Sequence, residues 1–91
     1  MKLPKQVSVL GETYVIKRIA SLMEREGCEG WCCSHTYTIA IDSSIKGRAL
    51  AKVYFHEVGH AFAFESGLHE FMNPQSREMF AQAFANFMCS R

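Results

Sequence analysis

The 91-residue chain lacks any long apolar run. No window approaches the roughly 18 uninterrupted apolar residues that a membrane-spanning helix needs. The opening segment, MKLPKQVSVLGETY, is interrupted too often by polar residues to resemble the apolar part of a signal peptide. We therefore expect a cytoplasmic protein with no membrane partner.

An excess of one sign of charge is also lacking. Ten Lys plus Arg stand against nine Asp plus Glu, for a net charge of +1. The basic residues are scattered and form no cluster that could follow a phosphate backbone, which disfavours nucleic acid as a partner. With 48% hydrophobic and 21% charged residues the composition is that of a folded protein. Because 91 residues provide one modest core, we expect residues 1–91 to form a single domain.

Cysteine is limited to four residues: Cys28, Cys32, Cys33 and Cys89. Without an export signal, a reducing cytosol favours free thiols over disulfides. A structural zinc site formed by the first three of these with His35 is disfavoured. Cys32 and Cys33 are neighbours in a predicted strand, so their side chains point to opposite faces and suit one tetrahedral ion poorly.

The first half of the chain predicts strands. β-Branched and aromatic residues on either side of Gly11 predict a hairpin or a bent strand over residues 6–18. Residues 31–33 and 36–41 predict two further strands. Residues 19–26 fit either a short helix or a connection, which ends at Gly27.

The second half predicts two helices. The capping residues Asp42-Ser43-Ser44 predict a helix from Ile45 to about Phe64, and Asn73-Pro74 predicts a last helix over residues 75–89. Three or four strands followed by two helices indicate an α+β fold, with a small antiparallel sheet on one side of the helices.

The first of these helices carries the segment HEVGH at residues 56–60. Residues four apart on a helix share a face, with Cβ atoms about 5–6 Å apart, so His56 and His60 can bind one ion. Zinc–nitrogen bonds of roughly 2.0–2.1 Å suit two rings from one helical turn. Glu57 is rotated by about 100° from His56, out of reach of the ion but able to accept a proton from a metal-bound water. The motif predicts a Zn²⁺ site with Glu57 as its catalytic base.

The competing interpretation is a pair of core histidines whose ring nitrogens are hydrogen-bonded within the protein. The pattern HExxH would arise by chance in roughly 1% of shuffled chains of this composition, so the five residues alone do not decide. Gly59 favours the metal site. A glycine inside a helix costs about 1 kcal/mol relative to alanine, and its usual purpose is to let another backbone approach closely.

HEVGH on a helix that follows a small sheet, with a further helix carrying a glutamate, resembles the zincin metallopeptidases of the gluzincin type. The short length and the segment EMFAQAFANFM, residues 78–88, are similar to small metallopeptidase-like proteins of bacteriophages and other mobile elements related to the ImmA/IrrE group. The resemblance covers residues 36–90, and only HExxH is specific. It implies a minimal zincin-like domain in which His56, His60 and Glu78 hold zinc and Glu57 is the base.

A catalytic zinc site usually takes three protein ligands and leaves a fourth position open. The candidates for the third are Glu65, His69, Glu70 and Glu78. Glu65 lies about 140° around the helix from His60, so we expect it to be solvated. The spacing of the metzincin subtype is excluded because Ala63 and Ser66 stand where it needs Gly and His.

Glu78 is the preferred third ligand, in the first turn of the last helix. The residues on its face, Ala81, Gln82 and Ala85, suit close contact with Gly59. The competing role for Glu78 is to stabilise the start of the helix through its dipole. A further rival ligand is Cys28, which resembles the cysteine that peptide deformylases place before their own HExxH.

A peptidase must also hold its substrate and stabilise the developing oxyanion. Residues 37–41 resemble the zincin edge strand that pairs with an extended substrate, although they serve equally well as sheet core. The candidate oxyanion donors are Tyr14, Tyr37, Tyr54 and His69.

The sequence thus favours a zinc-dependent metallopeptidase that hydrolyses a bond in a peptide or protein substrate, with a metal-activated water and Glu57 as general base. The alternative is a catalytically silent zincin-like module that binds a protein partner. A chain this small lacks the second subdomain that normally builds deep specificity pockets, which favours a shallow cleft.

Overall fold

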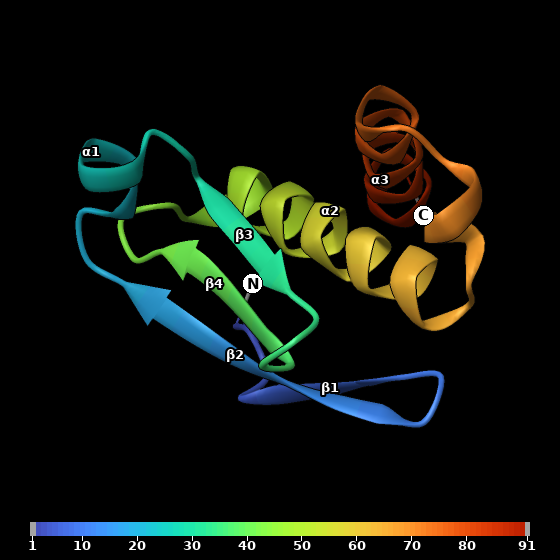
Figure 1. The fold of residues 1–91 in the computed structure, drawn as a ribbon. Coiled ribbons are helices and arrows are strands. Elements are labelled where there is room, and N and C mark those ends of the chain that lie inside the picture. The colour runs from blue at the N-terminus through green and yellow to red at the C-terminus, as the bar shows by residue number, and fades with distance from the viewer. Residues whose placement is uncertain (1, 91) are drawn as a thin grey trace.

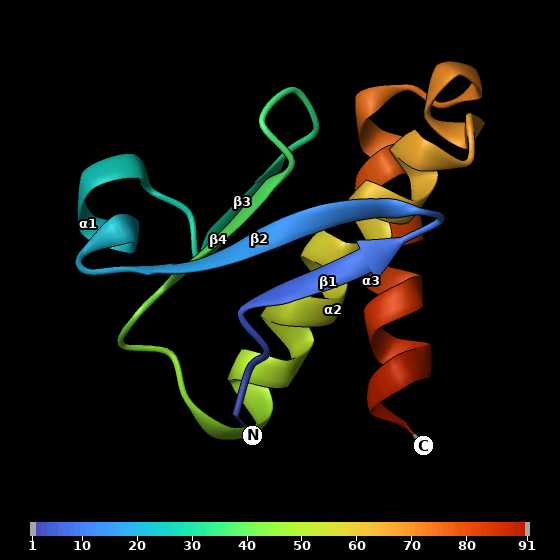
Figure 2. The same cartoon turned by 90° about the horizontal axis from the view of Figure 1, so that it is seen from below.

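The computed structural model describes residues 2–90 as one sheet followed by two long helices (Figure 1). The elements are β1 (Gln6–Val9), β2 (Glu12–Ile19), α1 (Leu22–Glu26), β3 (Gly30–Cys33), β4 (Thr38–Asp42), α2 (Gly47–Glu65), the 3-10 helix η1 (Leu68–Phe71) and α3 (Pro74–Cys89). α2 lies between the sheet and α3 (Figures 1 and 2). The predicted α+β class, with strands before two main helices, is confirmed.

The sheet has the strand order β1-β2-β4-β3 and is mixed. β1 with β2 and β3 with β4 are antiparallel, but β2 and β4 run parallel, from the pair Val15–Thr38 to the pair Ile19–Asp42. The expected wholly antiparallel sheet is therefore wrong in one pairing. The chain leaves β2 through α1 and forms the β3–β4 hairpin, which joins the sheet through its second strand.

The position of β4 inside the sheet changes the role of residues 37–41. β4 is hydrogen-bonded to β2 on one side and to β3 on the other, so it has no free edge for a substrate. The predicted edge strand is therefore wrong, and the alternative role of these residues, sheet core, holds: Ile39 and Ile41 are fully buried. The free edge on this side of the sheet belongs to β3.

Turn residues account for the local bends. The β1–β2 hairpin is confirmed, and its two-residue turn places Leu10 at φ 49° and Gly11 at φ 90°. Two successive positive φ angles suit the right-handed twist of paired strands. Residues 19–26 contain the short helix α1, and Gly27 ends it with a φ of 71°.

The two long helices begin differently from each other. Asn73 caps α3 as predicted, because its side chain accepts a 2.8 Å hydrogen bond from the Ser76 N–H. The cap predicted for α2 is wrong: α2 starts at Gly47 after Lys46, which makes no side-chain cap. The Asp42 carboxylate instead accepts hydrogen bonds from the Met23 N–H, at 2.8 Å, and from the N–H and hydroxyl of Ser44.

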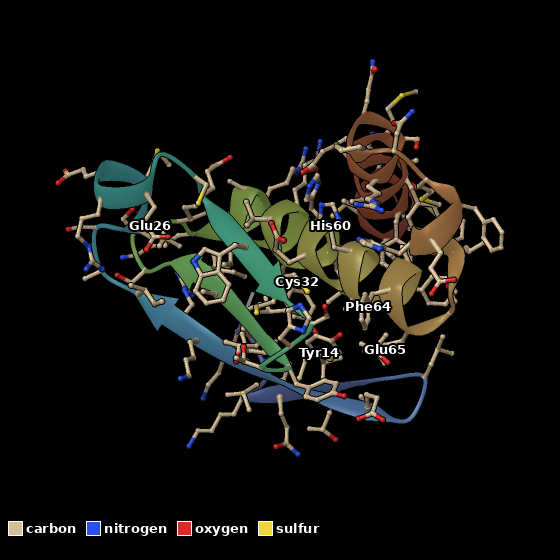
Figure 3. The ribbon with its side chains drawn as sticks, in the orientation of Figure 1. Tyr14, Glu26, Cys32, His60, Phe64 and Glu65 are labelled. Atoms are coloured by element: carbon tan, nitrogen blue, oxygen red, sulfur yellow. The ribbon has the colours of Figure 1, made fainter. Side chains whose placement is uncertain are left out.

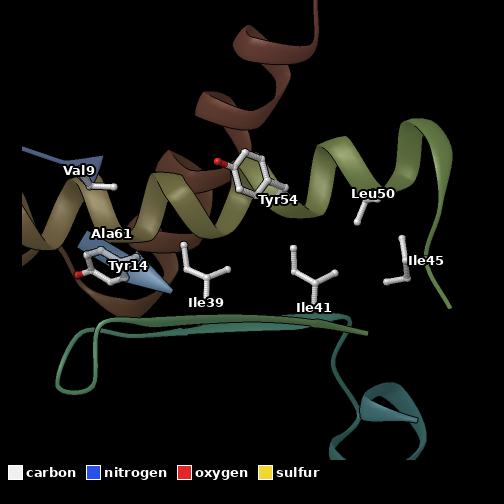
Figure 4. Packing of buried hydrophobic residues seen from close by; sticks show 8 residues of the cluster. All are labelled: Val9, Tyr14, Ile39, Ile41, Ile45, Leu50, Tyr54 and Ala61. Atoms are coloured by element: carbon white, nitrogen blue, oxygen red, sulfur yellow. The ribbon is translucent and has the colours of Figure 1, made fainter. Parts of the chain in front are cut away.

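The core lies between the sheet and one side of α2 (Figure 4). Tyr14 of β2 and the two isoleucines of β4 meet Leu50 and Tyr54 of α2, all with at most 5% exposure. This contact fixes the rotation of α2, so that its opposite side faces α3. None of the helices in residues 2–90 is long and apolar enough to span a membrane.

Candidate metal centre

The segment HEVGH lies in the middle of α2. Its two histidines and its glutamate lie on different sides of the helix. The His56 and His60 side chains are 21% and 22% exposed, whereas Glu57 is buried, with 7% exposure. The predicted 100° rotation between His56 and Glu57 therefore places them on different sides of α2. It also gives them different exposure to solvent. Figure 3 shows His60 on the side of α2 that faces α3.

Glu78 reaches this pair from α3. Its Oε2 atom lies 2.9 Å from Nε2 of His56 and 3.0 Å from Nε2 of His60. The two imidazole rings have centroids 4.9 Å apart, and one ligand atom from each of the three residues lies within 4.8 Å of the others. The three residues predicted from the sequence thus converge on one point.

The donor set could hold a metal ion. Ligand atoms that surround zinc tetrahedrally at roughly 2.0–2.1 Å are about 3.3 Å apart. The two measured Nε2–Oε2 distances are a few tenths of an ångström shorter than this, because the groups bind one another directly. Two imidazole nitrogens with one carboxylate oxygen form a three-ligand set typical of catalytic zinc sites. The Glu78 side chain is 63% exposed, so solvent reaches the site.

A close contact between the helices brings Glu78 within reach. A Cβ atom at Gly59 would lie 3.1 Å from Cα of Ala81 and 3.2 Å from Cβ of Phe84, closer than side chains normally pack. Ala81 and Ala85 are fully buried on the facing side of α3. The predicted packing role of Gly59 is confirmed, since even a methyl group there would require α3 to shift.

Glu78 lies beyond the first turn of α3. With Asn73 as the cap, Glu78 is the fifth helical residue, and the first turn contains no acidic residue. The predicted first-turn position is therefore wrong. The competing role through the helix dipole weakens with it, since that effect fades after the first turn.

The environment keeps Glu78 ionised. Partial burial raises its pKa, but the charge of His60 and hydrogen bonds from both histidines outweigh this and lower the pKa below its ordinary value. An ionised carboxylate is the form that ligates a metal.

Two residues of α3 orient the site in a way that the sequence did not reveal. Nδ1 of His56 lies 3.2 Å from Oε1 of Gln82, and Nε2 of Gln82 donates to Oδ1 of Asn86 at 3.1 Å. An amide oxygen only accepts, so this contact requires a hydrogen on Nδ1 of His56, which leaves Nε2 as the metal-binding nitrogen when the ring is neutral. The i, i+4, i+8 spacing of Glu78, Gln82 and Asn86 does indicate that the three residues share one helical face.

Glu57 lies under β3. A Cβ atom at Gly30 would be 3.6 Å from Cγ of Glu57, so the stem of this side chain lies between α2 and the edge strand. The pKa of Glu57 is raised to about 7, mainly by burial; the charge of His56 lowers the pKa and that of Glu78 raises it. A cation held by the triad would lower this pKa, because a nearby positive charge favours the carboxylate.

The other acidic candidate on α2 serves the core. Oε2 of Glu65 accepts a 2.6 Å hydrogen bond from the Tyr14 hydroxyl, so Glu65, which was expected to be solvated, is half-buried (Figure 3). The Tyr14 ring is fully buried, and its hydroxyl is already engaged.

The remaining predicted oxyanion donors lie in different surroundings. Tyr54 is 5% exposed and belongs to the core. Tyr37 is 40% exposed and packs edge-on against Tyr14. His69 packs edge-on against Phe64, and burial, followed by the charges of Arg77 and His60, lowers its pKa.

The cysteine alternatives do not form. Within residues 2–90, one group of His, Cys, Asp or Glu side chains is arranged to hold a metal ion, and it consists of His56, His60 and Glu78. Cys28 is not a member, and Cys32 and Cys33 do not combine with His35 into a second group.

Comparison with known proteins leaves the fold and this triad as the basis for assigning a function. The chain matches no protein-family model, no curated protein and no solved structure. The protein is thus an α+β chain in which two histidines of α2 and one glutamate of α3 form a group that can hold a metal ion.

Proposed function

We propose that the chain is a zinc-dependent peptidase of the gluzincin type, in which His56, His60 and Glu78 hold the metal. The observation that carries this proposal is the convergence of two imidazole nitrogens and one carboxylate oxygen from separate helices. A core histidine pair would need no acidic partner from α3.

Zinc in this position would supply a Lewis acid that polarises a carbonyl group and lowers the pKa of a water molecule. Glu57 takes up the proton at its carboxylate, from which it can pass to the leaving amine. Its place beneath β3 keeps it apart from the ligand set but within electrostatic range of His56 and Glu78.

β3 is the proposed docking edge for the substrate. It is an outer strand of the sheet that contacts α2, and Gly30 at its start lies against Val53 and Glu57. An extended peptide that pairs with this edge would continue the sheet through backbone hydrogen bonds. The scissile bond would then run past the triad, parallel to the sheet surface.

Substitution of the base tests the catalytic part of the proposal. We expect Glu57→Gln to retain zinc and to lose cleavage of a broad peptide mixture by about 10²- to 10⁴-fold, the usual effect of removing a general base. Cleavage products are measured by mass spectrometry and zinc by elemental analysis. Glu12→Gln, at an exposed position of β2, is the matched control.

Wild-type cleavage rates in Glu57→Gln would contradict the mechanism. The alternative function, a binding module without catalysis, predicts a different result: wild type and both variants hold zinc, and none of them cleaves.

A further inference from the structure

Two rows of side chains face each other between α2 and α3. On α2 the row is Arg48, Lys52, His56 and His60, and on α3 it is Glu78, Gln82 and Asn86. Residues four apart form the ridges by which helices pack. The contacts of His56 with Gln82 and of both histidines with Glu78 show that the two ridges meet at the triad.

The rows diverge beyond His56 and leave two adjoining cavities. The first, of about 350 Å³, is lined by Glu29, Ala49, Lys52, Val53, His56 and Gln82. The second, of about 480 Å³, is lined by Arg48, Lys52, Asn86, Cys89 and Ser90. Lys52 lines both, so the two cavities adjoin at this side chain, and the first of them reaches the proposed zinc ligand His56. We call the two cavities together the α2–α3 groove.

The far part of this groove is positively charged. Arg48 and Lys52 are exposed, and neither takes part in an ion pair within the part of the chain that the structure describes. Glu29 is the acidic residue at the first cavity, whereas the lining of the second cavity includes no acidic residue. The field at the second cavity therefore favours an anionic group.

The spacing of the two cations matches an extended peptide. Four helical residues advance by about 6 Å, so Lys52 and Arg48 lie about 6 and 12 Å along α2 from His56. Alternate residues of an extended chain are about 6.6–6.8 Å apart and point to the same side. Side chains two and four residues away from a bond held at the triad would thus reach the two cations in turn.

We propose that the α2–α3 groove binds the flanking part of an extended peptide and selects acidic side chains about two and four residues from the bond at the triad. This inference rests on the proposed function for the bond that is cut, and it adds the class of substrate. A peptide is favoured over a nucleic acid because Glu29, which lines the first cavity next to the triad, would repel a continuous phosphate backbone.

Binding to the cleavage-disabled Glu57→Gln protein tests the inference without relying on turnover. The probes are two fluorescein-labelled decapeptides, a threonine–glutamate repeat and its threonine–glutamine counterpart, measured by fluorescence anisotropy with zinc present. We expect the glutamate peptide to bind about three- to tenfold more tightly at low salt, since each exposed ion pair contributes a modest factor. The preference should shrink as salt is added.

Charge reversal locates the preference. Arg48→Glu with Lys52→Glu should abolish the difference between the two peptides. The matched control, Lys5→Glu with Lys17→Glu, makes the same change in net charge at exposed positions, one directly before β1 and one within β2, and it should preserve the difference. The inference is overturned if the two peptides bind equally, or if both double variants lose the preference alike. It is also overturned if a ten-nucleotide oligothymidylate binds more tightly than the glutamate peptide and responds to Arg48→Glu with Lys52→Glu.

The same reagents separate this inference from the proposed function. Cleavage of a peptide library by the wild type should enrich acidic residues two and four positions from the cut bond. Selective binding without any cleavage would refute the peptidase and support the groove. Cleavage without acidic enrichment, together with equal binding of the two probes, would refute the groove and support the peptidase.

Discussion

At the scale of single residues, Gln82 determines how His56 can act. Its amide oxygen accepts from Nδ1 of His56, and its own nitrogen donates to Asn86, which fixes the orientation of the amide. The Nε2 atom of His56 is thereby directed at the position shared with His60 and Glu78. Partners of this kind commonly hold a metal-binding histidine in one tautomer and one ring orientation.

Removal of the Gln82 amide should weaken metal binding without removing a metal ligand. We expect Gln82→Leu, which keeps the approximate size and loses the hydrogen bond, to reduce zinc affinity by about 10- to 100-fold. Competition with a fluorescent zinc chelator measures the affinity. Gln75→Leu, at an exposed position near the start of α3, is the control and should leave it unchanged. Equal affinities for the two variants would show that Gln82 does not position His56.

The sequence predicted the residues whose spacing along one helix decides their placement. His56, Glu57 and His60 followed from the helical period alone. The Tyr14–Glu65 hydrogen bond joins residues 51 positions apart and could not be foreseen, because the helical period says where Glu65 points but not which strand lies there. The same limit concealed the role of Gln82, which depends on how closely α3 approaches α2.

At the scale of elements, the contact between α2 and α3 controls the distance of Glu78 from the histidines. Gly59 permits this contact, and the fully buried Ala81 lies opposite. Any side chain at Gly59 must displace the backbone of α3, because the nearest atom is a Cα atom rather than the end of a flexible side chain.

Substitution of Gly59 should therefore affect both folding and metal binding. We expect Gly59→Val to lower the free energy of unfolding by about 1–3 kcal/mol, as overpacked sites do, and to weaken zinc binding by moving Glu78 outward. Urea unfolding and zinc titration measure the two effects. Ala83→Val, at an exposed position of α3, places valine in a helix without this contact and controls for helix propensity. Unchanged zinc affinity in Gly59→Val would show that the helix contact does not set the site.

Local patterns predicted which segments form strands and helices, but not which strands become neighbours. The parallel pairing of β2 with β4 depends on how the β3–β4 hairpin docks, and no residue within either strand encodes this. The start of α2 was misplaced for a similar reason. Asp42 and Ser44 have capping chemistry, but the Asp42 side chain is engaged by Met23, 19 residues earlier in the chain, as well as by Ser44.

At the scale of the whole molecule, Asp42 links elements that are distant in sequence. Asp42 is the last residue of β4. Its carboxylate accepts hydrogen bonds from the N–H of Met23 in α1 and from the N–H of Ser44 in the connection to α2. The hydrogen bond from Met23, followed by those from Ser44, lowers the pKa of Asp42 from 3.8 to about 2.

This pKa predicts how stability changes in acid. The unfolded chain binds a proton at Asp42 at a higher pH than the folded chain does, so the stabilisation is complete above about pH 5 and is lost as the pH falls towards 2. We expect the free energy of unfolding, measured with urea, to fall more steeply over this range in the wild type than in Asp42→Asn. Identical pH slopes for the two proteins would show that Asp42 does not contribute in this way.

If one metal ion joins α2 to α3, the purified protein contains zinc, and elemental analysis measures it. Purified wild type and His60→Ala are compared with His35→Ala, which changes a histidine outside the triad. We predict about one zinc per chain in the wild type and in His35→Ala, and little or none in His60→Ala, because two remaining ligands hold zinc poorly. A wild-type protein that binds no zinc, or a His60→Ala protein that binds as much as the wild type, would show that the triad does not hold zinc.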